Sequence, residues 1–351
     1  MRILFIHKDF PAGGGVEQVQ LRLAGQFTRD GHEVAFFVMN GDNVPGWPSV
    51  SGAGNGLSGL LGSSRRLRRL IRRGFTHLIA AKEQANLCTW LASRGTDSHV
   101  IYMRHSALNC VEQRTNPRLL GLLYSLYLLG DQGRAGAVSD SLVDALSRRM
   151  LWRRDRLHRC PNAVISDELD QLAQQPSPYP HPDRYWLAVG RLTPTKGFDV
   201  LLEAYEMASR QATLPTLVIV GEGPQAGSLK ALAYRLGIAS RVHFTGLLAN
   251  PYPLFRNAQL FVLSSRHEGL PTVLIEALAL GVPVLATDCE TGPRELLDGG
   301  RLGVLVAPGD PQALAEGMLR VREQTVPSSD EAVRDFHVSQ ATQAYYRVWS
   351  L

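Results

Sequence analysis

The chain has 351 residues, of which 44% are apolar and 20% charged, and its formal net charge is +5. This length is too great for one ordinary core and suits two domains of roughly 150 residues each, with the composition of a globular protein. The mild positive charge fits an anionic partner, such as a nucleotide, a diphosphate or a lipid headgroup. The longest apolar stretch, residues 118–130, falls short of the ~20 residues that a bilayer span needs.

The N-terminus, MRILFIHKDF, contains one cation and a short apolar run. It predicts a first strand and not a signal peptide. The four cysteines, Cys88, Cys110, Cys160 and Cys289, show neither metal-ligand spacing nor a paired framework. They are interpreted as reduced, buried thiols of a cytosolic protein.

The first half of the chain begins with a βαβ pattern. It consists of a strand at 3–6, a glycine corner at 11–17, a helix at 16–28, a turn at 30–31 and a strand at 33–38. A right-handed parallel crossover follows from this order. Later strands of the same sheet are predicted at 76–81 and 99–105, and the proline-rich segment 174–184 is predicted to be a linker.

The same rhythm continues in the second half, where each predicted strand precedes a helical segment. Their Val, Ile and Leu runs do not alternate with polar residues, which is typical of parallel strands buried on both faces. These strands span 185–190, 216–221, 241–246, 260–265, 282–287 and 303–308. We therefore expect two doubly wound α/β domains that face a cleft, with ligands at the carboxyl ends of the strands.

One such end is the loop RHEGLP, residues 266–271, which leads into an apolar helix. Proline is favoured at the start of a helix, so Pro271 indicates that the helix begins here. The first N–H groups of this helix form the positive end of its dipole, which suits phosphate. Glu268 stands before this helix and Glu276 on its second turn. Two carboxylates beside a phosphate can accept hydrogen bonds from the hydroxyls of sugars on either side of it. A ribose on one side and a hexose on the other describe a nucleotide sugar.

A second strand end lies in VGRLTPTKGFDVLLEAY, residues 189–205, where Arg191 and Lys196 follow the strand that ends at Gly190. Two cations at this position suit a diphosphate, and charge-assisted hydrogen bonds of this kind contribute ~1.5–3 kcal/mol each. They would also stabilise the charge that grows on a leaving nucleoside diphosphate.

These segments, together with GEGPQAGSLKALAYRLGIASRVHFTG (221–246), resemble the retaining GT-B glycosyltransferases of family 4. The resemblance covers about 186–320 in order and spacing. In the first half it rests on the glycine corner, VSDSLVDAL (138–146) and CPNAV (160–164). A Gly-Pro-Arg-Glu corner at 292–295 is similar to family members that extend lipid-linked or lipopolysaccharide glycans with hexose or N-acetylhexosamine units, and Thr291 and Gly292 could border the sugar.

The resemblance assigns roles to particular residues. Arg191 and Lys196 would hold the donor diphosphate, Glu268 the hydroxyls of the transferred sugar, and Glu276 the ribose. His105 would lie near the anomeric carbon, and with Arg191, Lys196 and Glu268 it forms the expected catalytic set. The remaining residues expected to bind the donor are Gly14, Gly15, Gly190, Gly221, Gly223, Thr245, Gly246, Leu247, His267, Gly269, Leu270, Pro271 and Thr272.

The implied reaction is a front-face displacement, with retention, that needs no protein nucleophile or general base. The favoured donor is a UDP-sugar, and the acceptor is a lipid-linked, lipopolysaccharide or polysaccharide glycan. No cofactor or metal is implied, because no Asp-x-Asp stands at a strand end. Two alternatives stay open: a nucleotide-sugar epimerase of the same fold, and a non-catalytic sugar-nucleotide-binding subunit. A dinucleotide dehydrogenase is excluded by the missing glycine fingerprint.

The segment SSRRLRRLIRR, residues 63–73, predicts a cationic amphipathic helix. It is either an ordinary surface helix or a contact with anionic lipid or with the acceptor, at the inner face of the cytoplasmic membrane. Nucleic acid is not expected, since no aromatic-studded basic groove accompanies the arginines. The candidate residues are Arg65, Arg66, Arg68, Arg69, Arg72 and Arg73.

Domain boundaries complete the prediction. We expect residues 1–170, plus about 335–351, to form an acceptor-binding domain, and 183–334 to form the nucleotide-sugar-binding domain. The final helix, with Tyr345, Tyr346 and Trp349, is expected to cross back to the first domain.

Overall fold

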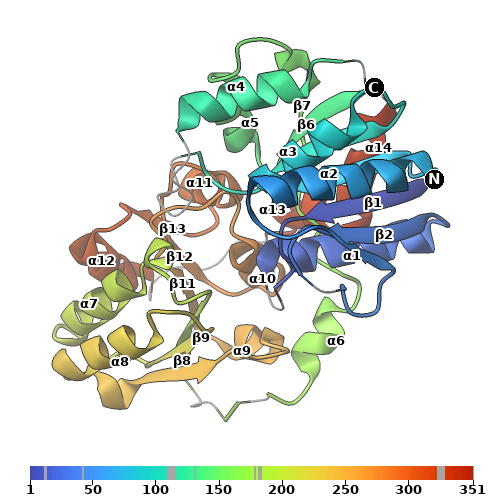
Figure 1. Ribbon diagram of the computed structural model, residues 1–351. Coiled ribbons are helices and arrows are strands. Elements are labelled where there is room, and N and C mark those ends of the chain that lie inside the picture. Colours follow the sequence, from blue (N-terminus) through green and yellow to red (C-terminus); the bar gives the residue numbers. More distant parts are fainter. Residues whose placement is uncertain are drawn as a thin grey trace. The chain divides into compact units, whose positions relative to one another are not determined.

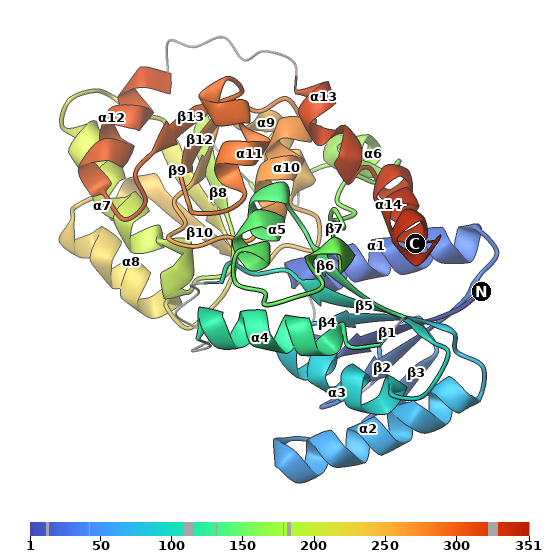
Figure 2. The same ribbon diagram turned by 90° about the horizontal axis from the view of Figure 1, so that it is seen from above.

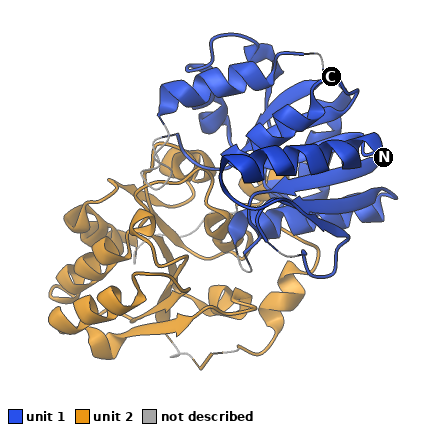
Figure 3. Cartoon of the chain, in the orientation of Figure 1, with its two compact units in different colours: residues 1–109, 115–164, 336–351 blue, residues 110–114, 165–335 orange. Residues whose placement is uncertain are grey.

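The computed structural model describes residues 1–11, 14–41, 43–108, 116–130, 132–177, 179–180, 184–321 and 329–350. The chain divides into two compact units (Figure 3). The first comprises Met1–Asn109, Thr115–Val164 and Phe336–Leu351, and the second chiefly Ile165–Asp335. Residues 165–170, assigned above to the first domain, belong to the second unit. There, the side-chain amide of Asn250 donates to the Leu172 carbonyl at 2.9 Å and so ties helix α6 (Leu169–Gln174) to that unit.

The first unit is built on a parallel sheet whose described strands follow the order β3-β2-β1-β4-β5-β6-β7. Helices α1 and α14 cover one face and α2, α3 and α4 the other (Figures 1 and 2). The strands are β1 (Arg2–His7), β2 (Glu33–Val38), β3 (Ser49–Ser51), β4 (His77–Ala81), β5 (His99–Arg104), β6 (Gly133–Ala137) and β7 (Leu157–Arg159). The helices are α1 (Gly15–Arg29), α2 (Gly56–Arg72), α3 (Glu83–Ser93), α4 (Pro117–Tyr127), α5 (Asp140–Ser147) and α14 (Val338–Ser350).

The second unit contains a parallel sheet of order β10-β9-β8-β11-β12-β13 in its described part. Helices α7, α8 and α12 cover one face, and α9 and α10 the other (Figure 2). The strands are β8 (Tyr185–Val189), β9 (Thr216–Val220), β10 (Val242–Gly246), β11 (Leu260–Leu263), β12 (Val284–Thr287) and β13 (Val304–Val306). The helices that follow α6 are α7 (Phe198–Ser209), α8 (Ala226–Arg235), α9 (Tyr252–Asn257), α10 (Thr272–Ala279), α11 (Pro293–Leu296), α12 (Pro311–Val321) and α13 (Asp330–Val333).

Both sheets confirm the predicted doubly wound α/β class, because each strand pair in the described part of the chain is parallel and crossover helices lie on both faces. The central strands explain why. In β1, Ile3, Leu4, Phe5 and Ile6 are fully buried, as expected of a strand covered on both sides. Such strands need crossover helices on each face to exclude water from them.

The last helix, α14, belongs to the first unit although the chain reaches it through the second. Phe27 of α1 contacts the rings of Tyr345, Tyr346 and Trp349, with centroid distances of 6.4, 5.4 and 5.5 Å. The Tyr346 hydroxyl also donates to Asp30 at 2.7 Å. The predicted return of the C-terminal helix to the first domain is therefore confirmed.

Three of the four cysteines are buried free thiols, as expected: Cys88, Cys160 and Cys289. Burial raises the pKa of each to about 12, so they are protonated at neutral pH. Cys110 lies outside the described residues. Across the described part of the chain, none of the helices has both the length and the apolar character required to cross a bilayer.

Candidate active site

The residues expected to bind a donor in the second unit lie at one edge of its sheet. They lie at or beyond the carboxyl ends of β8, β9, β10 and β11, which are neighbours in the order β10-β9-β8-β11. Because carboxyl ends of parallel strands share an edge, loops far apart in sequence come together there. The set comprises Gly190, Arg191, Lys196, Gly221, Gly223, Thr245, Gly246, Leu247, residues 267–272 and Glu276.

Two of these loops are fastened to each other through their backbones. The Ser264 hydroxyl donates to the Lys196 carbonyl at 2.9 Å, and the Arg266 N–H donates to the Thr195 carbonyl at 2.8 Å. Gly197 permits this approach. Its φ is +63°, and a Cβ there would lie 2.2 Å from the Ser264 carbonyl oxygen.

These contacts form a clamp between the loop of Lys196 and the loop of Glu268, and they bring the two side chains together. The Lys196 ammonium lies 2.6 Å from Glu268 Oε1, and the Ser265 hydroxyl donates to the same oxygen at 2.6 Å. Glu268 is 9% exposed, so this partly buried carboxylate needs both donors. Lys196 keeps a 20% exposed side chain, which leaves room for a further contact of its ammonium group.

A second ion pair reinforces the same loops. Arg266 donates to both carboxylate oxygens of Asp199, at 2.8 and 2.7 Å, and also to the Pro194 carbonyl at 2.8 Å. Burial would raise the pKa of Asp199, but the bonds from Arg266 outweigh it and hold the pKa below its usual value. A fork of this kind fixes geometry better than a single contact does.

Helix α10 begins at Thr272, with Pro271 as its N-cap. Its first backbone bonds run from Leu274 and Ile275 to the Pro271 carbonyl. The N–H groups of Thr272 and Val273 therefore have no acceptor one turn earlier in the helix. They form the positive dipole end predicted above, at the edge where Lys196 and Glu268 meet.

Glu276 is 8% exposed, as its apolar surroundings in sequence imply. Its carboxylate accepts a hydrogen bond from the Tyr252 hydroxyl at 3.1 Å. Because a buried carboxylate needs a hydrogen-bond partner, this contact with α9 helps to hold Glu276 in place. Tyr252 itself is not identifiable from the sequence, because nothing in the spacing of 24 residues indicates the contact.

The backbones at the carboxyl ends of β8, β9 and β10 lie in close contact, with no space for side chains between them. A Cβ on Gly221, whose φ is +141°, would lie 2.0 Å from the Gly190 carbonyl oxygen, and one on Gly223 would lie 2.5 Å from that of Leu192. The Gly221 N–H donates to the Gly246 carbonyl at 2.9 Å. The neighbouring Leu247 is 54% exposed.

The Gly-Pro-Arg-Glu corner packs on the loop of Glu268. The hydroxyl of Thr291, which is 2% exposed, donates to the Glu268 carbonyl. A Cβ on Gly292, with φ +95°, would lie 2.8 Å from Pro271 Cδ and 3.0 Å from the Gly269 carbonyl oxygen. This corner therefore supports the shape of the 268–271 loop.

In the first unit, Gly14 caps α1 and Gly15 is its first residue. The position of a Gly14 Cβ is only 1.9 Å from a carboxylate oxygen of Glu17. The absent side chain of Gly14 thus makes room for Glu17. Ala12 and Gly13, in the same predicted corner, lie outside the described residues.

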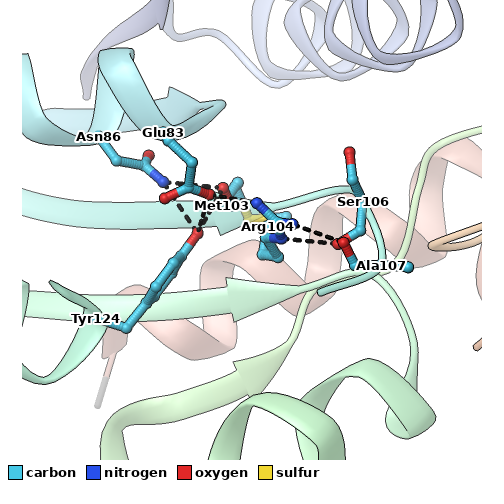
Figure 4. A network of polar contacts seen from close by, with 7 residues as sticks. All are labelled: Glu83, Asn86, Met103, Arg104, Ser106, Ala107 and Tyr124. Carbon is cyan, nitrogen blue, oxygen red and sulfur yellow. Dashed lines mark hydrogen bonds and ion pairs between the residues drawn. The ribbon is translucent and has the colours of Figure 1, made fainter. Parts of the chain in front are cut away.

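His105 follows β5, and its neighbours Arg104 and Ser106 belong to a network of polar contacts that no sequence pattern indicates (Figure 4). Arg104 pairs with Glu83 at 2.7 Å and donates to the carbonyls of Ser106 and Ala107, each at 2.7 Å. The loop that contains His105 is thereby tied to α3. Asn86 and Tyr124 extend the network to the Met103 carbonyl, at 3.1 and 3.2 Å.

Helix α2 confirms the predicted amphipathic pattern. Leu67 and Ile71 are buried, whereas Arg65, Arg66, Arg69, Arg72 and Arg73 are exposed. Arg66 donates to the carbonyls of Ser51 and Gly52, and Arg68 donates to those of Ala92 and Arg94. These two arginines therefore have structural partners in the unit.

The apolar segment 118–130 is partly buried and partly exposed. Leu120, Tyr124, Tyr127 and Leu128 are buried. Leu119 and Leu129 are 49% and 57% exposed. One side of α4 therefore packs against the core, and the other side is exposed to solvent.

Comparisons with known proteins agree with this architecture. Residues 13–168 match the model of Glycosyltransferase Family 4, and residues 183–324 match that of Glycosyl transferases group 1. The chain belongs to the family-4 glycosyltransferases.

Individual relatives and structures extend this result. The lipopolysaccharide core biosynthesis glycosyltransferases LpsE and LpsD of Rhizobium meliloti are 37% and 26% identical over 150 and 328 residues. The first match covers 42% of this chain but only 40% of LpsE, and the second covers 92% and 88%. Anabaena Alr3699/HepE, solved with UDP-glucose, has a TM-score of 0.79 at 21% identity, with 100% of both chains covered. This likeness shows the GT-B fold.

Proposed function

We propose that this chain transfers a hexose or N-acetylhexosamine from a UDP-sugar to a glycan acceptor, with retention of the anomeric configuration. The observation that supports it best is the clamp at the second unit's edge, where Lys196, Glu268 and the start of α10 meet. A cation and free helix N–H groups suit a diphosphate, and the adjacent carboxylate suits sugar hydroxyls.

The proposed step needs no covalent enzyme intermediate. The bond between the anomeric carbon and the diphosphate oxygen breaks, and the acceptor oxygen bonds to that carbon on the same face. The acceptor proton passes to the departing phosphate oxygen. Arg191, Lys196 and the α10 N-terminus would stabilise the charge on the UDP that leaves. His105, in the first unit, keeps the role that the family resemblance implies.

No metal is assigned to this step. The diphosphate charge would be met by the two cations and the helix dipole. Within the described ranges, no group of three His, Cys, Asp or Glu side chains has an arrangement suited to a metal ion.

The acceptor class is proposed from the relatives, since LpsE and LpsD are named for lipopolysaccharide core biosynthesis. We infer a lipid-linked or lipopolysaccharide glycan. A place on the inner face of the cytoplasmic membrane is part of the same proposal. It is supported by the exposed arginines of α2 and by Leu57 and Leu61, which are 73% and 43% exposed on the same helix.

The test uses purified full-length chain, UDP, GDP and their sugars in a thermal-shift panel, followed by transfer to glycan acceptors. UDP and one UDP-sugar should raise the melting temperature, because a ligand that binds only the folded state stabilises it. Lys196→Ala and Glu276→Ala should each lower turnover at least tenfold, equivalent to ~1.4 kcal/mol. Both variants should keep the wild-type far-UV circular dichroism spectrum.

The outcomes separate the candidates. A UDP-sugar that changes configuration without an acceptor would indicate an epimerase, and binding without any turnover would indicate an inert binding subunit. Unchanged turnover in either variant would remove the assignment of this site.

A further inference from the structure

Among the described residues, charged side chains at the carboxyl edge of the first unit's sheet form four ion pairs. The pairs come from loops that follow β1 and β4, from the ends of β5 and β7, and from the starts of α1, α3 and α5. Their closest atoms are 3.7, 2.5, 2.7 and 3.5 Å apart in Lys8–Asp9, Lys82–Glu17, Arg104–Glu83 and Arg159–Asp140, respectively. Each pair contributes one positive and one negative charge, so their sum is zero.

The Lys82–Glu17 pair is the most constrained of them. Glu17 is 3% exposed, and its carboxylate fills the space beside Gly14. Lys82 has a φ of +75°, a left-handed conformation that a lysine adopts only when its surroundings require it. Its side chain is 38% exposed, so the ammonium group contacts Glu17 and still reaches solvent with its other donors.

Next to this pair lie buried polar atoms whose hydrogen bonding is incomplete. Both ring nitrogens of His105, the Asn162 side-chain oxygen, His7 Nδ1 and Gln20 Nε2 are shielded from solvent and lack a well-aligned hydrogen bond among the described residues. His105 interacts electrostatically with His7, Glu17 and Lys82, and the Asn162 side chain, of the CPNAV segment, lies within reach of its ring. Unsatisfied buried polar atoms cost ~1–3 kcal/mol each, so several of them in one place indicate a missing partner.

We propose that this edge binds the reacting sugar unit of the acceptor through Lys82, His105 and Asn162, and that it takes an uncharged sugar in preference to one bearing a carboxylate or phosphate. The proposal rests on the transferase function above and deepens it by naming the acceptor class.

The preference follows from charge and hydrogen bonding. An anionic group brought to Lys82 meets an ammonium that Glu17 already neutralises, and it approaches the Glu17 carboxylate itself. Sugar hydroxyls both donate and accept, which matches a site with ammonium and amide donors, an amide oxygen and imidazole nitrogens. Burial, followed by the charges of His7 and Lys82, lowers the pKa of His105 to about 3, so the ring is neutral at pH 7.

The test compares sugars that differ only in a carboxylate. Saturation-transfer NMR and titration, both with UDP present, would use methyl β-glucoside against methyl β-glucuronide and methyl β-galactoside against methyl β-galacturonide. We expect at least one neutral glycoside to bind at least tenfold more tightly than its acidic counterpart. Equal affinity, a preference for the acids, or binding of none of the four would overturn the inference.

A charge-switch variant provides the specific readout. Glu17→Gln leaves Lys82 without its counter-charge and should shift the neutral-to-acid affinity ratio at least fivefold toward the acids, whereas Lys82→Met should weaken the neutral sugars. Glu33→Gln is the matched control, because it removes the same charge from an exposed pair with Arg2 at the start of β2. An unchanged ratio in Glu17→Gln would also overturn the inference.

The donor site gives an independent check. If UDP raises the melting temperature of wild type and of all three variants, a negative sugar result rejects only the acceptor inference. If UDP has no effect on wild type, the proposed transferase function itself fails.

Discussion

At the scale of single residues, Gly197 determines how closely the loops of Lys196 and Glu268 approach. Its φ of +63° costs alanine ~1–2 kcal/mol, and a Cβ would in addition clash with the Ser264 carbonyl. Gly281 has a φ of +69° with nothing within 4 Å of its Cβ position. We expect Gly197→Ala to lower the melting temperature more than Gly281→Ala does, and to weaken UDP binding in calorimetry. Equal decreases in melting temperature for the two variants would show that the positive φ of Gly197, and not the clash with the Ser264 carbonyl, determines the effect.

Buried histidines make a second residue-scale prediction, on pH. Burial lowers the pKa of His7 to about 3, against ~6.5 for an unfolded chain, and the same holds for His105. Below pH 6.5 the unfolded chain binds protons that the folded chain does not, so stability decreases as pH falls from 6.5 toward 3.

The slope is at most ~1.4 kcal/mol per pH unit for each histidine. Melting temperatures measured between pH 6.5 and 5 should fall steadily, above the range where carboxylates titrate. His7→Gln should flatten the dependence. A melting temperature that is constant across this window in wild type would contradict the assignment of neutral buried rings.

At the scale of elements, the strands with long apolar runs are predictable from sequence, and those with small residues are not. Runs such as 3–6 and 216–221 became strands within one or two residues of the prediction. Strand β6, with the sequence GRAGA, was missed. A Cβ on its Gly136 would lie 2.4 Å from Met103 Sδ and 2.9 Å from Cys160 Sγ. The close packing that requires small residues also removes the hydrophobic signal of a strand.

The candidate site also contains some features that the sequence predicts and others that it does not. Arg191, Lys196, Glu268 and Glu276 could be proposed because each stands at a strand end or helix start. Contacts between loops could not, since the pair Arg266–Asp199 joins residues 67 positions apart. Only the order of the strands brings them together. Asn162 had a sequence signal in CPNAV, but the segment alone gives no hint that its amide is buried beside His105.

Helix α2 gives an element-scale prediction about the membrane. Arg65, Arg69 and Arg72 are exposed, whereas Arg66 and Arg68 bind backbone carbonyls of the same unit. Substitution of the first three by Ser should remove binding to vesicles that contain anionic phospholipid, and binding by wild type should weaken with salt. Vesicles of neutral phosphatidylcholine are the control. Equal sedimentation of variant and wild type with anionic vesicles would reject a membrane role for α2.

At the scale of the whole molecule, the chain leaves its first unit and returns to complete it. Helix α14 places Trp349, 8% exposed, against Phe27 and His77 at ring distances of 5.5 and 4.9 Å. The stability of the first unit therefore depends on residues that follow the whole of the second. The clamp that joins Lys196 to Glu268 lies within the second unit alone.

This arrangement predicts that the two units can be destabilised separately. Trp349→Ala should cost the first unit ~3–5 kcal/mol, as large-to-small changes at buried aromatic positions do. Tyr234→Ala, at an 80% exposed position in the second unit, is the control. Scanning calorimetry should show the first unit of Trp349→Ala melting earlier, while UDP still raises the transition of the second. If UDP no longer stabilises that variant, UDP binding depends on an intact first unit, and the clamp of the second unit does not hold the nucleotide by itself.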